Sequence, residues 1–245
     1  MIKRYKVEGH LHVKGNSWCG KTDASDIIKL YKENHYDGII VTNHFNRHIY
    51  QNYFKAEDRE GKLQEFFKSY NELKNNTEGI KVYFAVEFAL QDDHYNFIFK
   101  KDCAEMLVYG ITPEEFIEYG TDIIDMDYKG LKELSNKMGW IVCQAHPYRE
   151  STKLIDVDCI DGLEVFNGNP RHVNRNRKAL KRAEKYGLIQ TVGSDFHQAH
   201  DISSAFVFEE MPKDEKDLVR VLKSGHYDTL KGKRALRRFD RKRKY

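Results

Sequence analysis

The sequence contains no run of about 18 consecutive apolar residues, so no membrane-spanning helix is expected. Its first residues, M-I-K-R-Y-K-V, lack the apolar stretch of a secretory signal. The four cysteines (Cys19, Cys103, Cys143 and Cys159) are scattered and form no C-x-x-C pair. Without an export signal, reduced thiols and a cytoplasmic location are the expectation.

Internal repeats and low-complexity linkers are also lacking, and only four prolines interrupt the 245 residues. The composition is polar, with 32% charged residues and a mean hydropathy of -0.73, yet it is 40% hydrophobic and 13% aromatic. That apolar content supports a packed core and argues against a disordered chain. The length suits one large α/β domain or two small ones.

Positive charge is concentrated at the end of the sequence. Residues 231–245 hold nine Lys/Arg and one Asp, whereas the whole chain carries a net +3, so the first 230 residues are mildly acidic. We expect a folded domain over residues 1–230 and a mobile basic tail over 231–245. A contact of this tail with nucleic acid or another polyanion is the alternative interpretation.

Short apolar segments alternate with segments of helical period. Strands are predicted at 5–12, 38–42, 80–90, 104–111, 140–145, 161–166 and 188–192, and helices at 22–34, 63–75, 128–138, 174–186 and 213–223. A hairpin-like excursion separates the third strand from the fourth. The alternation predicts a parallel sheet or barrel, in which functional residues gather at the carboxyl ends of the strands.

Ionisable or polar side chains accompany each predicted strand, most of them at its end, with Glu87 inside the third strand and Glu105 at the beginning of the fourth. In chain order they are His10, His12, His44, Glu87, Glu105, His146, Glu164, Asn167, Asp195 and His197. The first two are two residues apart, so in a strand they point to the same face.

Burying so many unpaired ionisable groups would be prohibitively costly. Divalent cations are the natural partner, because imidazole and carboxylate are ligands that Zn, Mn and Fe accept. The candidate ligands are too many for one four-coordinate ion, and Glu87, in the middle of the set, suits a bridging carboxylate. The pattern therefore predicts a metal centre.

Seven motifs occur in an order that resembles the PHP (polymerase and histidinol phosphatase) superfamily of metal-dependent phosphoesterases. They are E-G-H-L-H, V-T-N-H, V-E-F, A-E-M-L-V-Y-G, Q-A-H-P-Y-R, D-G-L-E-V-F-N-G and V-G-S-D-F-H. The resemblance covers the chain to about residue 230. It implies an α/β fold, a distorted (β/α)7 barrel, with two or three divalent ions (Mn, Zn or Fe, with Mg also possible) at the C-terminal ends of the strands.

The resemblance assigns ligands to two ions position by position. The first ion would be held by His10, His12, Glu87 and Asp195. The second would share Glu87 and add His146 and a residue that is usually histidine in the family. Glu105 occupies that position here, and His94 is the alternative.

A third ion would be held by His44 and His197. Its remaining ligand in the family falls near Cys19, which could bind as a thiolate or simply be a small buried residue. The family motif T-D-H is T-N-H in this chain, so Asn43 is a neutral partner where a carboxylate is usual, which would lower the basicity of the group it orients.

The activity implied by the resemblance is hydrolysis of a phosphate ester, a phosphomonoester in the first instance, by a metal-activated water. Arg149 and Arg171 each follow a site strand and are candidates to stabilise phosphoryl charge. Asn167 and Asn169 are candidates to hold the Arg171 loop or to touch the substrate. A phosphorylated small molecule or a nucleotide is the expected substrate.

Two other classes stay open. Amidohydrolases, which act on C–N bonds, also begin with H-x-H on the first barrel strand, but they commonly bridge their metals with a carbamylated lysine where this chain has Glu87. A metal-stabilised scaffold or nucleic-acid module is the non-catalytic alternative. The basic residues 231–245 could also guide a nucleic-acid-end phosphatase or nuclease.

Overall fold

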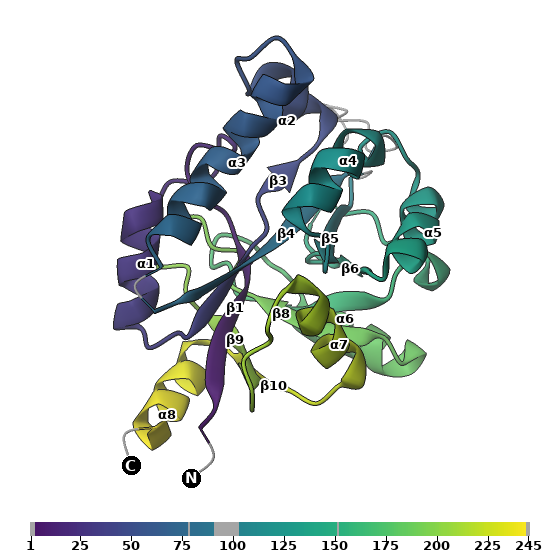
Figure 1. The fold of residues 1–245 in the computed structure, drawn as a ribbon. Coiled ribbons are helices and arrows are strands. Elements are labelled where there is room, and N and C mark those ends of the chain that lie inside the picture. The colour runs from purple at the N-terminus through teal and green to yellow at the C-terminus, as the bar shows by residue number, and fades with distance from the viewer. Residues whose placement is uncertain (1–2, 78, 91–102, 151, 244–245) are drawn as a thin grey trace.

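The computed structural model of the chain describes residues 3–77, 79–90, 103–150 and 152–243. In these ranges the strands are β1 (Tyr5–Leu11), β2 (Gly38–Val41), β3 (His44–Phe45), β4 (Lys81–Ala89), β5 (Glu105–Tyr109), β6 (Ile141–Gln144), β7 (Gly162–Asn167), β8 (Ile189–Gly193), β9 (Ser204–Phe208) and β10 (Asp228–Lys231). Figure 1 shows the helices arranged around this sheet: α1 (Ala24–Glu33), α2 (Arg47–Asn52), α3 (Arg59–Asn75), α4 (Pro113–Ile123), α5 (Tyr128–Met138), α6 (Asn176–Tyr186), α7 (Glu215–Ser224) and α8 (Lys233–Arg243). One turn of 3-10 helix spans Val157–Cys159.

The strands form one sheet that curls into a nearly closed barrel. β1, β2 and β4 are parallel neighbours, and so are β6, β7 and β8. β3 pairs with the end of β4, while β9 and β10 extend the sheet in antiparallel fashion beside β1. The predicted distorted α/β barrel is confirmed, and β1, β2 and β4 to β8 correspond to the seven strands expected from the sequence.

Two glycines allow β1 and β8 to meet where the barrel closes. A Cβ atom on Gly9 would lie 2.1 Å from a backbone carbonyl oxygen of β8, and one on Gly193 would lie 2.2 Å from the Cβ of His10. Just beyond, the His12 N–H donates to the Phe196 carbonyl at 2.9 Å and the Phe196 N–H to the His10 carbonyl at 3.1 Å. We call this junction between β1 and the end of β8 the seam.

One strand of the seven runs the opposite way. β5 is antiparallel to both β4 and β6, so the uniformly parallel arrangement expected from the sequence is wrong at this strand. The hairpin-like excursion predicted before it falls mainly on 91–102, which lie outside the described residues. Because of the reversal, Glu105 at the start of β5 pairs with Ala89 at the end of β4. The first residue of β5 therefore lies at the edge where the parallel strands end.

The helices begin where the sequence supplies capping side chains. The Thr112 hydroxyl accepts from the Glu115 N–H, and the Glu115 carboxylate accepts from the Thr112 N–H, with Pro113 in the first turn of α4. Asp127 and Asp214 each accept a hydrogen bond from the first turn of α5 and α7. These caps fix where each helix starts and so how it lies on the sheet.

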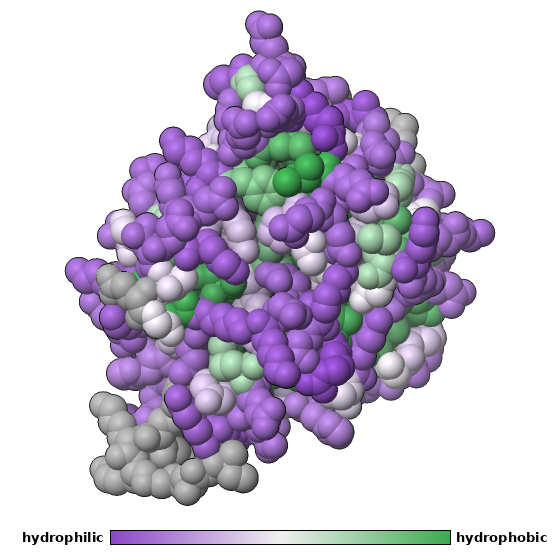
Figure 2. All heavy atoms as spheres, in the orientation of Figure 1, coloured by the Kyte–Doolittle hydropathy of each residue, from purple (hydrophilic) through white to green (hydrophobic). Residues whose placement is uncertain are grey.

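Aromatic packing fills the space between the helices and the sheet. The rings of Phe66 in α3 and Phe116 in α4 stack with centroids 4.4 Å apart, and Phe45 in β3 meets Phe116 edge-on at 4.8 Å. The face drawn in Figure 2 is mostly hydrophilic, with small separated hydrophobic areas. Among the described helices, none combines the length and the apolar character needed to cross a bilayer.

The C-terminal segment differs from the mobile tail expected over residues 231–245. β10 runs to residue 231, past the boundary predicted at 230, and α8 packs on the body: Leu236 is buried, and Lys6 Nζ lies 2.5 Å from Asp240 Oδ1. The charge run concealed this arrangement, because Lys233, Arg234, Arg237, Arg238 and Arg241 are exposed while Leu236 reaches the core. α8 contacts the first half of β1, at the opposite end of the strand from His10.

Candidate metal centre

The eight metal ligands predicted from the sequence meet at one end of the barrel. Each has a side-chain nitrogen or oxygen within 3.4 Å of a nitrogen or oxygen atom of another member. They come from the ends of β1, β4 and β8, from β3, from the start of β5 and from the turn after β6. The members are His10, His12, His44, Glu87, Glu105, His146, Asp195 and His197. The alternative ligand His94 lies outside the described residues.

The first group of donors surrounds the ends of β1 and β8. The Nε2 atoms of His10 and His12 lie 2.9 Å apart. Glu87 Oε2 is 3.3 Å from His10 Nε2 and 3.2 Å from His12 Nε2, and Asp195 Oδ1 is 3.6 and 3.4 Å from the same two atoms. Two imidazoles and two carboxylates thus converge on one point.

The second group shares Glu87. His146 Nε2 lies 3.3 Å from Glu87 Oε1 and 3.3 Å from Glu105 Oε2. His44 Nδ1 is 2.9 Å from Glu87 Oε2 and 3.4 Å from Glu105 Oε1. Glu87 therefore stands between the two groups, and Glu105, which the resemblance assigned to the second ion, lies beside His44 and His146.

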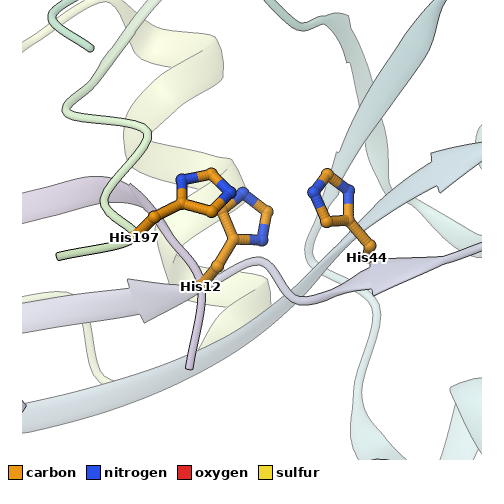
Figure 3. Close-up of side chains that lie close together, drawn as sticks. All are labelled: His12, His44 and His197. Carbon is orange, nitrogen blue, oxygen red and sulfur yellow. The ribbon is translucent and has the colours of Figure 1, made fainter. Parts of the chain in front are cut away.

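The third group is formed by three histidine rings, drawn in Figure 3. The ring of His12 lies 4.2 Å from that of His44 and 4.4 Å from that of His197, centroid to centroid. The Cys19 thiol contacts both His44 and His197. Burial alone would raise the pKa of this thiol, but the two imidazoles lower it to about 4. Among the described residues, His12, His44 and His197 could hold an ion together.

Asn43 does not play the role expected of it. Its Oδ1 accepts from the N–H of Val13 at 2.9 Å, and its Nδ2 donates to Ser69 Oγ at 3.3 Å. In the described contacts it therefore fixes the backbone that follows His12, rather than orienting a ligand ring.

The chemistry of the cluster fits metal ions. Glu87 is completely buried, and neither of its carboxylate oxygens accepts an aligned hydrogen bond from a described residue. A buried carboxylate without a donor is costly unless a cation satisfies it. Burial alone would lower the pKa of His10, but Glu87, Glu164 and Asp195 raise it well above its ordinary value. A divalent ion would replace the proton that the His10 imidazole otherwise holds.

Two further buried carboxylates support the ligands from behind. Glu164 Oε1 lies 2.9 Å from His10 Nδ1, and its Oε2 accepts from the His146 N–H at 2.8 Å. With Nδ1 protonated, Nε2 of His10 is free to bind an ion. Glu8 accepts from the N–H groups of His10 and Ser194, at 3.1 and 2.8 Å, and so ties β1 to β8.

The sequence placed Glu164 on a strand but gave it no role, and it missed Glu8. The available signal was the spacing of Glu8, His10 and His12, each two residues from the next, although the register of β1 shifts between Glu8 and Leu11, so these residues do not simply alternate on one face.

Two of the predicted ligands adopt a backbone conformation that is unusual for residues other than glycine. His146 has φ 27° and Asp195 has φ 51°. The Glu164 carboxylate holds the N–H of His146, and Asn169 Nδ2 donates to the carbonyl of Asp195 at 3.0 Å. Non-glycine residues in this region concentrate at functional sites, where the surrounding structure enforces them.

The predicted arginines line a cleft of about 580 Å³ that opens on the cluster. Arg149 Nη2 lies 2.5 Å from Asp195 Oδ2, and its Nε donates to Asn174 Oδ1 at 2.9 Å. Arg171 donates to the fully buried Asp201 at 2.6 Å. Lys21, His172 and Gln198, which the sequence did not single out for the site, line the same cleft.

Asn167 lies behind Arg149. Its Oδ1 accepts from Arg149 Nη2 at 3.2 Å and from the Asn169 N–H at 3.1 Å, and its Nδ2 donates to Glu164 Oε2 at 2.8 Å. Asn169 Oδ1 in turn accepts from the Arg171 N–H, which holds the Arg171 loop. These contacts give Asn167 a positioning role in the free protein.

The fold and the site define a barrel protein with a cluster of residues able to bind divalent metal, and three comparisons with known proteins bear on its family. A family model described as PHP-associated matches residues 173–227. An uncharacterized protein of Methanocaldococcus jannaschii is 35% identical over 92 residues, an alignment that covers 35% of this chain and 37% of that relative.

Three solved structures share the fold. A candidate metal-dependent phosphoesterase of Bifidobacterium adolescentis superimposes with TM-score 0.52 at 12% identity, covering 89% of this chain and 95% of that one. A two-domain protein of Bacteroides vulgatus with a predicted PHP-like phosphoesterase gives 0.58 at 14%, covering 94% and 65%. An amidohydrolase of Chromobacterium violaceum gives 0.54 at 13%, covering 91% and 97%.

At these identities the solved structures establish the fold. The matched family model, over residues 173–227, agrees with the resemblance of the seven motifs to the PHP superfamily.

Proposed function

We propose that the protein is a metal-dependent phosphoesterase that hydrolyses a phosphate ester, a phosphomonoester in the first instance. The observation that carries this proposal is the buried Glu87 carboxylate, which lies between two groups of candidate metal ligands, beside a cleft that holds two arginines. Paired ions and guanidinium groups are the means by which proteins stabilise a reacting phosphoryl group.

Two divalent ions, of Mn, Zn or Fe with Mg as an option, would be held by the first and second groups of ligands. A third ion would bind Cys19, His44 and His197, and a reducing cytoplasm would keep that thiol available. Bound divalent ions polarise the phosphoryl group and activate water as the nucleophile.

The protein's own groups position the reaction. Glu164 fixes the ring of His10, and the network of Asn167 and Asn174 directs the guanidinium of Arg149 toward the cluster. A phosphate in the cleft would compete with Asp195 for Arg149, so the arginine would move from a ligand to the substrate. Arg171, already paired with a buried carboxylate, would contribute a second positive charge at the rim.

The amidohydrolase neighbour supports a second candidate, hydrolysis of a C–N bond. The donors described above include no lysine, and Glu87 occupies the bridging position. A nucleic-acid end is a further candidate substrate, with residues 231–245 proposed as its contact.

The decisive experiment measures metal content and turnover together. Protein purified without chelator or affinity nickel is analysed by mass spectrometry, beside Glu87→Gln and the matched control His226→Ala, which alters an exposed histidine of the α7–β10 connection. We expect two or three equivalents of metal in the wild type and the control, and a clear loss in Glu87→Gln.

Turnover is then assayed on p-nitrophenyl phosphate, nucleoside monophosphates and a panel of amides. Hydrolysis of phosphate esters that requires Glu87 would support the proposal. Hydrolysis confined to amides would transfer the assignment to the second candidate. A wild type that takes up no metal even after Mn or Zn addition would contradict both.

A further inference from the structure

The segment 174–186, which includes α6 and the residues just before it, carries a concentration of positive charge outside the metal centre. It contains six cations and one acidic residue, Glu184, within a body of 230 residues that is acidic overall. None of the six forms an ion pair with a side chain in the described part of the chain, and all but one are exposed. The cations are Arg175, Arg177, Lys178, Lys181, Arg182 and Lys185.

Four of these cations line one groove. It measures about 320 Å³ and is formed by Tyr148, Lys178, Lys181, Arg182, Lys185 and Tyr186, which we call the α6 groove. The Nζ of Lys185 lies 4.8 Å from the centroid of the Tyr186 ring, and the guanidinium of Arg182 lies 5.5 Å from it. Tyr186 is nevertheless 46% exposed. The groove thus combines unpaired positive charge with accessible aromatic surface.

The α6 groove adjoins the metal centre. Tyr148 is the neighbour of Arg149 in the chain, and its carbonyl accepts from Arg175 Nη1 at 3.0 Å. The cap region of α6 is hydrogen-bonded into the site, because Asn174 Oδ1 accepts from Arg149 Nε and Asn176 Oδ1 accepts from the N–H of Asn167. From this point the helix runs outward for 11 residues, about 16 Å at the usual rise per residue.

We propose that the α6 groove binds single-stranded nucleic acid and presents its terminal phosphate to the metal centre. Cations spaced along a groove match the phosphates of a polynucleotide backbone, and tyrosines beside them match its unstacked bases. This inference rests on the proposed function for the chemistry at the end of the strand. It moves the main nucleic-acid contact away from α8, which lies beside the far end of β1.

The test compares two triple variants that remove equal charge. Lys178→Ala/Lys181→Ala/Lys185→Ala alters the α6 groove, and Arg234→Ala/Arg238→Ala/Arg241→Ala alters the exposed face of α8. Binding of a fluorescein-labelled 12-nucleotide DNA strand to the metal-loaded full chain is measured by anisotropy across a range of salt concentrations. None of these residues belongs to the metal centre, so turnover of p-nitrophenyl phosphate serves as the control for folding.

The expected loss follows from counterion release. Each phosphate contact contributes about 0.7 to the slope of log affinity against log salt for a single strand, so losing three lowers the slope by about 2. At about 0.1 M salt this corresponds to a roughly 100-fold weaker complex. The α6 variant should show this loss, while the α8 variant should stay near the wild-type value.

A second variant tests for a single strand. Tyr186→Ala should weaken binding of the 12-nucleotide strand about tenfold and leave binding of the corresponding duplex unchanged. An equal loss for strand and duplex would contradict stacking in the groove.

The remaining outcomes are distinct. Loss of binding in the α8 variant alone would overturn the inference in favour of the C-terminal helix. Absence of oligonucleotide binding, with anionic phosphatidylserine vesicles captured through the α6 lysines, would replace it with a membrane contact. Oligonucleotide binding at α6 in a protein that hydrolyses no ester would contradict the proposed function and leave the binding surface standing.

Turnover of a phosphorylated strand tests whether the α6 groove presents the strand end to the metal centre. On a 5′- or 3′-phosphorylated 12-nucleotide strand the α6 variant should show a raised KM, with p-nitrophenyl phosphate unaffected. Equal KM values for the strand in the variant and the wild type would contradict presentation by this groove.

Discussion

Replacing Glu164 by glutamine tests whether the carboxylate behind the metal centre governs both stability and metal affinity. Its Oε1 contacts His10 Nδ1 at 2.9 Å, and its Oε2 accepts from the His146 N–H and from Asn167 Nδ2, both at 2.8 Å. The side chain is fully buried. A carboxylate accepts at both oxygens, whereas a glutamine has one accepting end and one donating end.

The introduced glutamine can take two amide orientations, and one lowers the stability of the protein while the other lowers its metal affinity. If its oxygen faces His10, its amide N–H groups face two donors, and leaving both unsatisfied costs about 2 kcal/mol or more of unfolding free energy. If its oxygen faces His146 and Asn167, its N–H meets His10 Nδ1 and favours the tautomer with a proton on Nε2. That proton opposes the ion, and loss of such a partner weakens metal binding about 10- to 100-fold.

The two effects are measured separately. Urea denaturation of metal-free protein gives the stability, and competition with a chromogenic chelator gives the metal affinity, with the exposed Glu209→Gln as the matched control. We expect Glu164→Gln to lose at least one of the two quantities by the amounts above. A variant that matches the wild type in both would refute the assigned role of Glu164.

Further predictions address the other parts of the molecule. In protein loaded with Co²⁺, Cys19→Ser should abolish the near-ultraviolet charge-transfer absorption between thiolate and cobalt. The visible cobalt bands of the first two sites should persist in this variant. A wild-type protein that lacks the charge-transfer absorption would show that the Cys19 thiol is not a ligand. Metal affinity should rise with pH, because burial and Arg149 lower the pKa of His146 but Glu105 and Glu87 raise it to about 9. The metal-free protein therefore holds a proton on His146 at pH 7, and a bound ion must displace it. Calorimetry in buffers of different ionisation enthalpy should detect the release of this proton, and a metal affinity that does not change with pH would contradict the prediction. Leu236→Ala should lower the unfolding free energy by about 2 kcal/mol because α8 is packed, whereas a free tail would give no change in urea denaturation.

Most of the barrel and the ligand set could be predicted because both follow from local patterns. Strand ends carry the ligands, and residues two apart on a strand share a face, so His10 and His12 could be paired without knowledge of the fold. Glu105 was different. It starts its strand, and only the reversal of β5 brings it to the site, a fact of pairing between distant segments rather than of local sequence.

Other features depended on tertiary packing that a charge pattern conceals. In the described part of α8 the buried Leu236 shows that the segment packs, whereas the cations around it in the sequence indicate solvent. The role of Asn43 was misassigned for a similar reason. Its neighbour in the motif, His44, is a candidate ligand, but the Asn43 side chain accepts a hydrogen bond from the backbone of Val13.

A metal ion at this site would also stabilise the seam between β1 and β8. His10 and His12 stand on one side of it and Asp195 on the other, and among described residues the chain after β8 is joined to β1 by the short bridge at Leu11 and Phe196. An ion bound by all three side chains would crosslink the two sides of the seam and so hold the barrel closed there. Removing it should let amide protons near β1 and β8 exchange sooner than those of β4, so that the barrel opens first at the seam.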